Sequence, residues 1–227
     1  DEPGAGKGGL TVYLLAPTVL RVAPDDFQAR VRSRFASELR RAGRFAQLCL
    51  LGAQACLDAA GGDGPFAVLW ASEFGALHAT RAALDEDLRR GEPAMPFAFI
   101  AAQPHLAGAL LAQRSHPVTR TACLYLAADA WPSLPQLAQR WLAECDRVLV
   151  GCVEESAAGA AHRSDWCLLQ KRPAAGAVRC ERSLKAENAA AAAAEDWIPR
   201  VAAWRGSADA PLLLRGGEDA WSFTSNG

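Results

Sequence analysis

The chain alternates between short apolar runs and longer amphipathic stretches. The run at 146–153 is apolar almost throughout, which is typical of a strand that is covered on both faces of a sheet. Gly64 and Pro65 introduce another apolar run, and the segment at 118–126 is rich in residues that favour strands. The pattern predicts strands at 10–16, 64–72, 118–126, 146–153, 165–172 and 178–184.

The amphipathic stretches predict helices. Pro24 followed by two aspartates is a helix start signal, and Gly61 ends a strongly apolar helix that begins near Arg44. Cys49 and Cys56 are seven residues apart in that helix, so they share one face, which we interpret as a core face. The predicted helices cover 25–41, 44–60, 77–90, 106–113, 130–144 and 185–205.

Strands that alternate with helices predict an α/β fold with a mixed, mostly parallel sheet and helices on both faces. A loop around Pro173 and Gly176 separates the last two predicted strands, which indicates a hairpin. No repeat or linker divides the chain. We predict a flexible start at 1–9, a main domain at 10–184, and a C-terminal helix and tail at 185–227 that ends in a ragged polar segment from 211 onward.

Composition narrows the functional classes. The formal net charge is -1, so the overall balance favours neither nucleic acid nor a strongly acidic partner. No apolar run is long enough to cross a bilayer, so no membrane span is expected. The first nine residues are polar and rich in glycine, with no apolar core of a signal peptide, which predicts a cytoplasmic protein.

The cysteine pattern argues against disulfides and metals. The seven cysteines lie mostly in apolar segments, which indicates reduced thiols. None of them forms a Cys-x-x-Cys pair and the four histidines are scattered, so no metal site is predicted. Glycine-rich nucleotide loops and the Gly-x-Ser-x-Gly hydrolase motif are also missing, and we expect no cofactor.

Several segments match a known family in the same order along the chain. They are Ala-Ser-Glu-Phe-Gly at 71–75, Gly-Glu-Pro at 91–93, Ala-Gly at 107–108, Thr-Ala-Cys at 121–123 and the strand-forming segment at 144–154. Over about residues 10 to 184 the chain resembles the N-terminal domains of β-ketoacyl synthases, in the thiolase superfamily. It is most similar to the short chain-length-factor-like proteins of aryl polyene and type II polyketide gene clusters. The resemblance implies half of a thiolase-like fold.

The resemblance places Cys123 where condensing enzymes carry their acyl-thioester nucleophile. In the family this cysteine lies on a tight turn at a helix N-terminus, which stabilises the thiolate. Here the bulky Leu124 and Tyr125 follow it, and the family spacing puts the nucleophile about three residues later, near Leu126. The half that carries the family's catalytic histidines is also missing. We therefore interpret Cys123 as an unreactive strand cysteine and keep a nucleophile as the alternative.

Other candidates follow from position. His105 lies close to where the family has a polar His-Asn pair, and the alternative is that it caps the helix after Pro104. Arg30, Arg34 and Arg41 lie on a basic helix that could attract an acidic acyl carrier protein, or could be a solvated face.

Four acidic or basic residues are assigned structural or solvated positions. Asp129 is expected to cap the helix that follows it, and the loop with Glu154, Glu155 and His162 is expected to be solvated.

Three functional hypotheses remain. The first is a non-catalytic, chain-length-factor-like subunit that acts with a full-length ketosynthase in polyketide, aryl polyene or fatty-acid-type biosynthesis. The second is an active condensing enzyme of the β-ketoacyl synthase type, or an acyltransferase, that uses Cys123 with histidines of a partner. The third is a regulatory module, or one that binds acyl carrier protein, without chemistry. Because the resembled fold dimerises by pairing sheet edges, a homodimer or heterodimer is expected.

Overall fold

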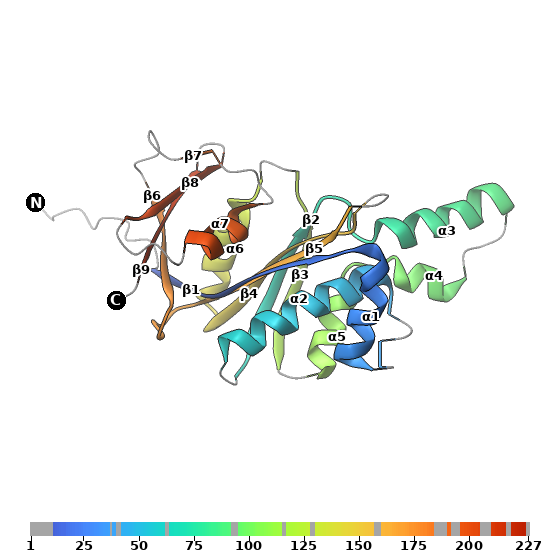
Figure 1. Ribbon diagram of the computed structural model, residues 1–227, viewed down its shortest axis with the longest axis horizontal. Helices are drawn as coiled ribbons and strands as arrows, with labels where there is room; N and C mark the ends of the chain where they lie inside the picture. Colours follow the sequence, from blue (N-terminus) through green and yellow to red (C-terminus); the bar gives the residue numbers. More distant parts are fainter. Residues whose placement is uncertain are drawn as a thin grey trace, which may run out of the picture.

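The computed structural model describes residues 11–36, 38–39, 42–61, 64–91, 95–114, 117–127, 130–156, 160–183, 190–191, 196–204, 210–216 and 219–225. These residues form one sheet whose strands run in the order β3-β2-β4-β5-β1-β6-β9-β8-β7 (Figure 1). The α/β class, the mixed sheet and the helices on both faces are confirmed. The expectation of a mostly parallel sheet is wrong, because five of the eight strand pairings in the described residues are antiparallel.

The parallel part of the sheet lies at one edge. β2 (Phe66–Ser72) is flanked by β3 (Val118–Tyr125) and β4 (Arg147–Glu154), and all three run in the same direction. Every residue of β2 is buried, as its uninterrupted apolar run predicts. The carboxyl ends of these three strands therefore meet at one side of the sheet, where the β2–α3 and β3–α6 connections begin.

The centre of the sheet is antiparallel because β1 (Val12–Val22) lies between β5 (His162–Gln170) and β6 (Val178–Ser183). Leu14 is paired with Leu169 on one side and with Val178 on the other. The predicted hairpin between these two strands is therefore wrong. β5 and β6 are not paired with each other, because the eleven-residue strand β1 lies between them and pairs with both.

Helices cover the two faces of the sheet with separate cores. On one face lie α1 (Pro24–Phe35), α2 (Arg44–Ala60) and α5 (Leu106–Arg114), and α2 has the start and end that its sequence predicts. On the other face lie α6 (Ser133–Leu142) and α7 (Trp197–Trp204). Cys49 and Cys56 are both buried on the sheet-facing side of α2, as expected.

A close approach in the core depends on a glycine. A Cβ atom at Gly151 of β4 would lie 2.5 Å from the ring of Trp166 on β5, so this position has room only for a hydrogen. The indole of Trp166 packs closely against Gly151, and its N–H donates to the hydroxyl of Ser164 at 2.8 Å.

Two further helices project from the body. α3 (Leu77–Arg90) has the bounds that the pattern predicts, whereas α4 (Pro96–Ala101) forms where a loop was expected. Both extend away from the sheet at one end of the molecule (Figure 1). None of the described helices has the length and hydrophobicity that a crossing of a bilayer requires.

The C-terminal segment is part of the sheet, and the predicted polar end is wrong. β8 (Leu212–Gly216) and β9 (Asp219–Ser225) form a hairpin, and β9 pairs with β6. The signal is the alternation of Trp221 and Phe223, which are fully buried on one face. The predicted helix at 185–205 is reduced to α7, and β7 (Ala190–Ala191) within that range pairs with β8.

Truncation of Phe223 tests this integration. We expect Phe223→Ala to lower the free energy of unfolding by about 3–5 kcal/mol, because a fully buried aromatic side chain leaves a cavity. Ser225→Ala, at an exposed position of the same strand, changes it by less than about 0.5 kcal/mol. Urea denaturation measures both, and equal stabilities would show that the hairpin is not part of the folded domain.

Candidate functional site

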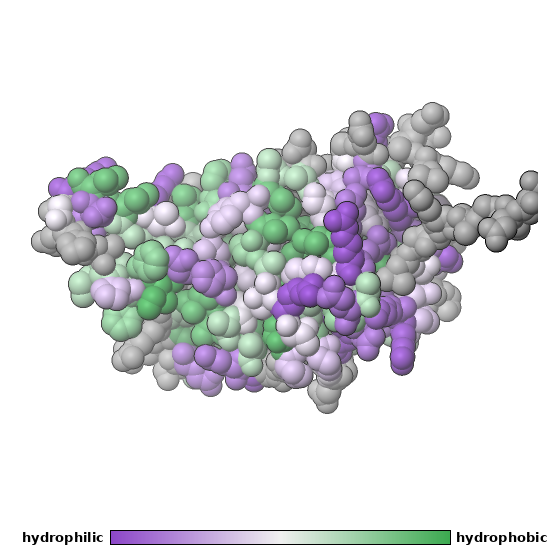
Figure 2. Space-filling view, turned by 180° about the vertical axis from the view of Figure 1, so that it is seen from behind, coloured by the Kyte–Doolittle hydropathy of each residue, from purple (hydrophilic) through white to green (hydrophobic). Residues whose placement is uncertain are grey.

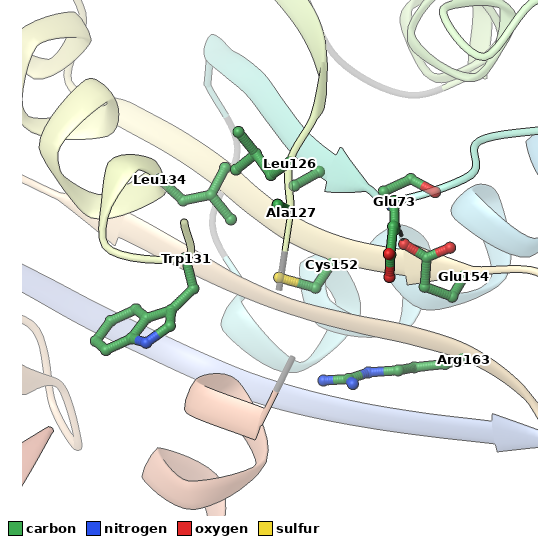
Figure 3. A pocket seen from close by; sticks show the side chains of 10 residues that line it. Glu73, Leu126, Ala127, Trp131, Leu134, Cys152, Glu154 and Arg163 are labelled. Carbon is green, nitrogen blue, oxygen red and sulfur yellow. Dashed lines mark hydrogen bonds between the residues drawn. The ribbon is translucent and has the colours of Figure 1, made fainter. Parts of the chain in front are cut away.

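The candidate site is a pocket at the carboxyl ends of the parallel strands, the usual place for ligand sites in such sheets (Figure 3). It is a small cavity with a volume of about 40 Å³. Its walls come from the ends of β2 and β4, the β3–α6 connection, α6 and the start of β5. The lining residues are Ala71, Ser72, Glu73, Leu126, Ala127, Trp131, Leu134, Cys152, Glu154 and Arg163.

The pocket has an apolar side and a polar side. Leu126, Trp131 and Leu134 form the apolar side in Figure 3, and Glu73, Glu154 and Arg163 lie together on the other. Trp131 is buried and stacks on Trp197 of α7 with ring centroids 5.8 Å apart. This stacking joins α7 to the segment just before α6.

Glu154 binds the backbone of the β2–α3 turn. Its Oε1 accepts a hydrogen bond from the N–H of Glu73, and the hydroxyl of Ser72, whose Oγ accepts the N–H of Gly75 at 2.8 Å, lies beside it. Burial raises the pKa of Glu154 above its usual value, although these hydrogen bonds oppose the change. The carboxylate therefore organises the turn.

Cys152 is the thiol that faces the pocket. Burial raises its pKa to about 12, although the Trp197 side chain and Arg163 both lower it. A thiol with such a pKa is protonated at neutral pH and is a poor nucleophile. The site thus contains a sulfur atom without the means to ionise it.

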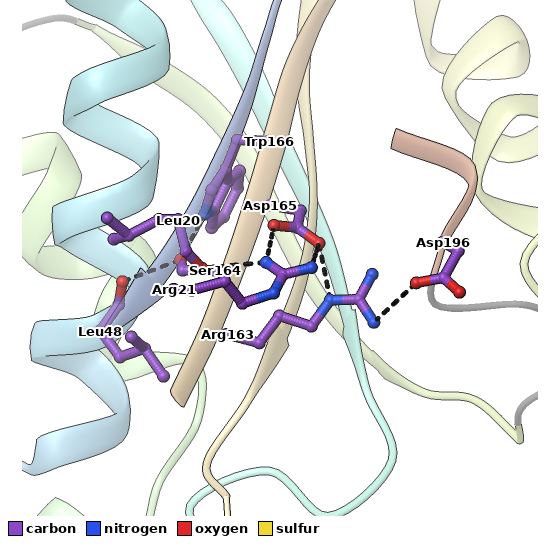
Figure 4. Close-up of polar contacts among 8 residues, drawn as sticks. All are labelled: Leu20, Arg21, Leu48, Arg163, Ser164, Asp165, Trp166 and Asp196. Atoms are coloured by element: carbon purple, nitrogen blue, oxygen red, sulfur yellow. Dashed lines mark hydrogen bonds and ion pairs between the residues drawn. The ribbon is translucent and has the colours of Figure 1, made fainter. Parts of the chain in front are cut away.

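A charged network lies below the pocket and ties three elements together (Figure 4). Asp165 of β5 is fully buried and accepts hydrogen bonds from both terminal nitrogens of Arg21 on β1, one of them at 3.1 Å. The Nε of Arg163 donates to the same carboxylate at 2.6 Å, and its Nη1 lies 3.8 Å from Asp196, just before α7. The network fixes the direction of Arg163 at the pocket wall.

Cys123 lies inside β3 and not at a turn. It is opposite Trp70 of β2, and Leu124 and Tyr125 continue the strand beyond it. It packs against the core under α2, and it does not line the pocket. Burial, with a smaller contribution from Glu154, raises its pKa to about 12. Since α6, the helix that follows β3, begins only at Ser133, the sulfur does not lie at its N-terminus, and the geometry favours the interpretation of Cys123 as an unreactive strand cysteine.

The other predicted residues lie elsewhere. His105 is exposed in the turn before α5, where its carbonyl accepts the N–H of Gly108 at 3.0 Å. Arg30 is exposed on α1, and Arg34 forms an ion pair with Asp58 of α2, which reduces the basic patch. Arg41 and Asp129 lie outside the described residues. None of the described candidates lines the pocket.

The expectation of a solvated loop after β4 is wrong. Glu155 is 4% exposed and His162 is 1% exposed, and both have defined hydrogen-bond partners. The signal that was missed is positional: Glu73 directly follows β2 and the two glutamates close β4 and follow it, so the ends of neighbouring parallel strands bring their carboxylates together.

The sheet and the pocket at its strand ends form an α/β fold that is similar to the fold of solved ketosynthase and chain length factor structures. Among solved structures, it is similar to a ketosynthase in complex with its chain length factor (ApeO and ApeC) from Xenorhabdus doucetiae, at 14% identity, a TM-score of 0.60, and coverage of 94% of this chain and 96% of that chain. The ishigamide ketosynthase/chain length factor aligns at 12% identity and a TM-score of 0.65, over 95% of this chain and 100% of that chain.

A third similar structure is the type II polyketide synthase complex AntDE:AntF, an acyl-carrier protein with its ketosynthase bound to the hexaketide. It aligns at 11% identity and a TM-score of 0.63, over 94% of this chain and 99% of that chain. No known family profile and no curated protein sequence matches the chain. The expected resemblance in fold is confirmed.

Removal of the buried carboxylate tests the network. Asp165→Asn leaves Arg21 and Arg163 without their shared anion, and we expect a loss of about 3–5 kcal/mol in the free energy of unfolding. Asp58→Asn breaks the exposed pair with Arg34 and should cost less than about 1 kcal/mol. Chemical denaturation of both variants decides, and equal losses would contradict a structural role for the network.

Alkylation tests the state of the thiols. Because its pKa is about 12, Cys123 should react with iodoacetamide at about pH 7.5 roughly three orders of magnitude more slowly than an exposed cysteine. Peptide mapping after timed labelling measures the rate, with the protein in concentrated urea as the control in which all cysteines react alike. Rapid and selective labelling of Cys123 in the folded protein would support the nucleophile alternative.

Proposed function

We propose that the chain is a non-catalytic, ketosynthase-like subunit of the chain-length-factor type, which acts with a full-length ketosynthase in polyketide, aryl polyene or fatty-acid-type biosynthesis. The observation that carries the proposal is the pocket. Directly after β3, the described residues that line the pocket are Leu126 and Ala127, and neither is a nucleophile. The only cysteine among the described lining residues is Cys152, whose thiol is protonated. The pocket offers no activated nucleophile among the described residues.

The similar structures support this proposal by their composition. Two of them are described as complexes of a ketosynthase with a chain length factor. Each of the three alignments covers 94% to 95% of this chain and 96% to 100% of the similar chain. The chains are therefore of about equal length.

The free edge of the sheet supports a dimer. In the described residues β3 is paired only with β2, so its outer edge presents unpaired backbone groups that a second sheet could pair with. Tyr125, at the end of β3, is 62% exposed, and Phe74 at the root of α3 is 55% exposed. Exposed apolar side chains continue onto α3 and α4, at Leu84, Leu88, Met95, Phe97, Phe99 and Ile100.

The distribution of hydropathy agrees with a partner on this side. Figure 2 shows hydrophobic residues gathered over the half of the molecule that carries α3 and α4, and hydrophilic ones toward the half that carries β6. An exposed apolar surface of this extent marks an interaction site. We propose a ketosynthase as the partner in a heterodimer, with a homodimer as the form in its absence.

Acyl carrier protein is the second proposed partner. One similar structure is described as an acyl-carrier protein in complex with its ketosynthase. Of the predicted basic patch, Arg30 remains exposed on α1, and we propose that it attracts the acidic carrier by long-range charge. Carrier-dependent acyl synthesis also implies the cytoplasm as the place of action.

Association with a ketosynthase tests the proposal. Co-expression with a full-length partner ketosynthase should give a stable one-to-one complex by size-exclusion chromatography with light scattering. Tyr125→Asp should weaken the complex roughly tenfold or more, because it puts a charge into the proposed interface. Val19→Asp, at a 42% exposed apolar position on β1, is the matched control and should leave the affinity unchanged.

The same complex distinguishes a structural from a catalytic role. Cys123→Ala should leave product formation by the complex unchanged, since the proposed subunit forms no thioester. Intact-mass analysis with an acyl-carrier substrate should place the acyl group on the ketosynthase alone. An acyl adduct on this chain that disappears in Cys123→Ala would establish the catalytic alternative.

A further inference from the structure

The backbone N–H and carbonyl of one residue after β4, Ser156, are each bound by a histidine. The N–H of Ser156 donates to Nδ1 of His162 at 3.1 Å, and the carbonyl oxygen of Ser156 lies 3.2 Å from Nε2 of His78. His162 opens β5, and His78 lies in the first turn of α3. The two rings thus join the β4–β5 connection to the root of α3.

The geometry of His162 requires the neutral ring. A neutral imidazole has one nitrogen that donates and one that accepts, whereas the protonated ring donates from both. Because Nδ1 accepts the N–H of Ser156, its lone pair is occupied and the proton of the ring is on Nε2. If Nδ1 were protonated, its N–H would face the N–H of Ser156, and this hydrogen bond would be lost.

The surroundings of His162 also disfavour a charge. The ring is 1% exposed and meets the edge of Phe27 on α1, with ring centroids 5.3 Å apart. The charged or titratable groups that act on it are Arg44 at the start of α2 and His78 on α3. Nε2 has no hydrogen-bond partner among the described residues.

Glu155 completes the connection. Its Oε2 accepts the N–H of His78 at 3.0 Å, so the carboxylate caps the first turn of α3. No described side chain of α3 or α4 is buried, and the polar contacts at the root are therefore a main restraint on the direction of this helical pair. A change in the conformation of residue 156 would reach α3 through Glu155 and His78.

We propose that His162 is a pH-responsive latch: its protonation breaks the hydrogen bond to Ser156 and releases the root of α3 from the β4–β5 connection. This inference stands on the geometry of the isolated chain and does not depend on the proposed function. The closed state contains neutral His162, and the open state contains the solvated imidazolium.

The direction of the pH dependence follows from linkage. Burial, and then Arg44 and His78, lower the pKa of His162 in the closed state below its usual value of 6.5. The open state therefore binds protons more readily, and the closed state loses stability as the pH falls below about 6.5. Above that value the latch is closed in full.

Hydrogen exchange with mass spectrometry tests the latch. On going from about pH 7.5 to about pH 5.5, after correction for the intrinsic rates, peptides that contain Ser156 and the first turns of α3 should exchange roughly two- to tenfold faster. Peptides from β2 and α2 should not change. This local pattern separates the latch from a general acid destabilisation.

Two variants assign the effect to one ring. His162→Asn keeps an acceptor near the place of Nδ1 but cannot be protonated, and its exchange should be independent of pH. His78→Gln keeps a donor near the place of Nε2, and it should retain the response of the wild type. A response that persists in His162→Asn, or vanishes in His78→Gln alone, would overturn the proposal.

A measurement on the unaltered protein covers the case in which a variant does not fold. With ¹⁵N-labelled histidine, the ring nitrogens of His162 should report the neutral form with the proton on Nε2 at about pH 7.5. They should titrate with the same midpoint as the exchange of Ser156. A proton on Nδ1 at about pH 7.5, or a midpoint above that of free histidine, would contradict the latch.

Discussion

The whole structure depends on the pairing of β1 with strands on both of its edges. β1 joins the parallel part of the sheet, through β5, to the C-terminal strands, through β6. It also carries α2 on one face and α7 on the other. Near the end of β1, Arg21 binds the buried Asp165 on the neighbouring strand β5. β1 therefore also supplies a charge to the network that holds Arg163 at the pocket wall. Among the described strands, only β1 connects the two sides of the sheet by backbone pairing.

Burial then determines the chemistry of the site. Cys152 at the pocket and Cys123 inside β3 both lie in buried surroundings, and the cost of desolvating a thiolate keeps them protonated. The carboxylates of Glu154 and Glu155 are engaged by backbone N–H groups of the β2–α3 connection. Groups that could have served catalysis are thereby used to hold the start of α3.

This arrangement connects the pocket with the exposed side of the molecule. The turn bound by Glu154 leads into α3, and the end of β3 lies against the same turn, since a Cβ atom at Gly75 would come within 2.8 Å of the Tyr125 hydroxyl. The pocket, the free edge of β3 and the apolar helical pair therefore share one support. This shared support agrees with the proposed role of a subunit that binds a partner.

The local sequence pattern was sufficient to predict those helices and strands whose own residues are apolar enough to require burial. The uninterrupted apolar run of β2, the long apolar helix α2 and the motif around Cys123 led to the correct fold class and to the structural resemblance. The partner of each strand could not be predicted in the same way, because an apolar edge fits many neighbours, and so β1 was not expected between β5 and β6.

Tertiary structure alone decided the chemical state of the candidate residues. The sequence determined that a thiol stands at 123 and carboxylates at 154 and 155. Only the packing determined that the thiol lies within a strand, that Glu155 is buried and that His162 must be neutral. The physical reason is that protonation and reactivity depend on solvation and on hydrogen-bond partners, and these come from segments far apart in the chain.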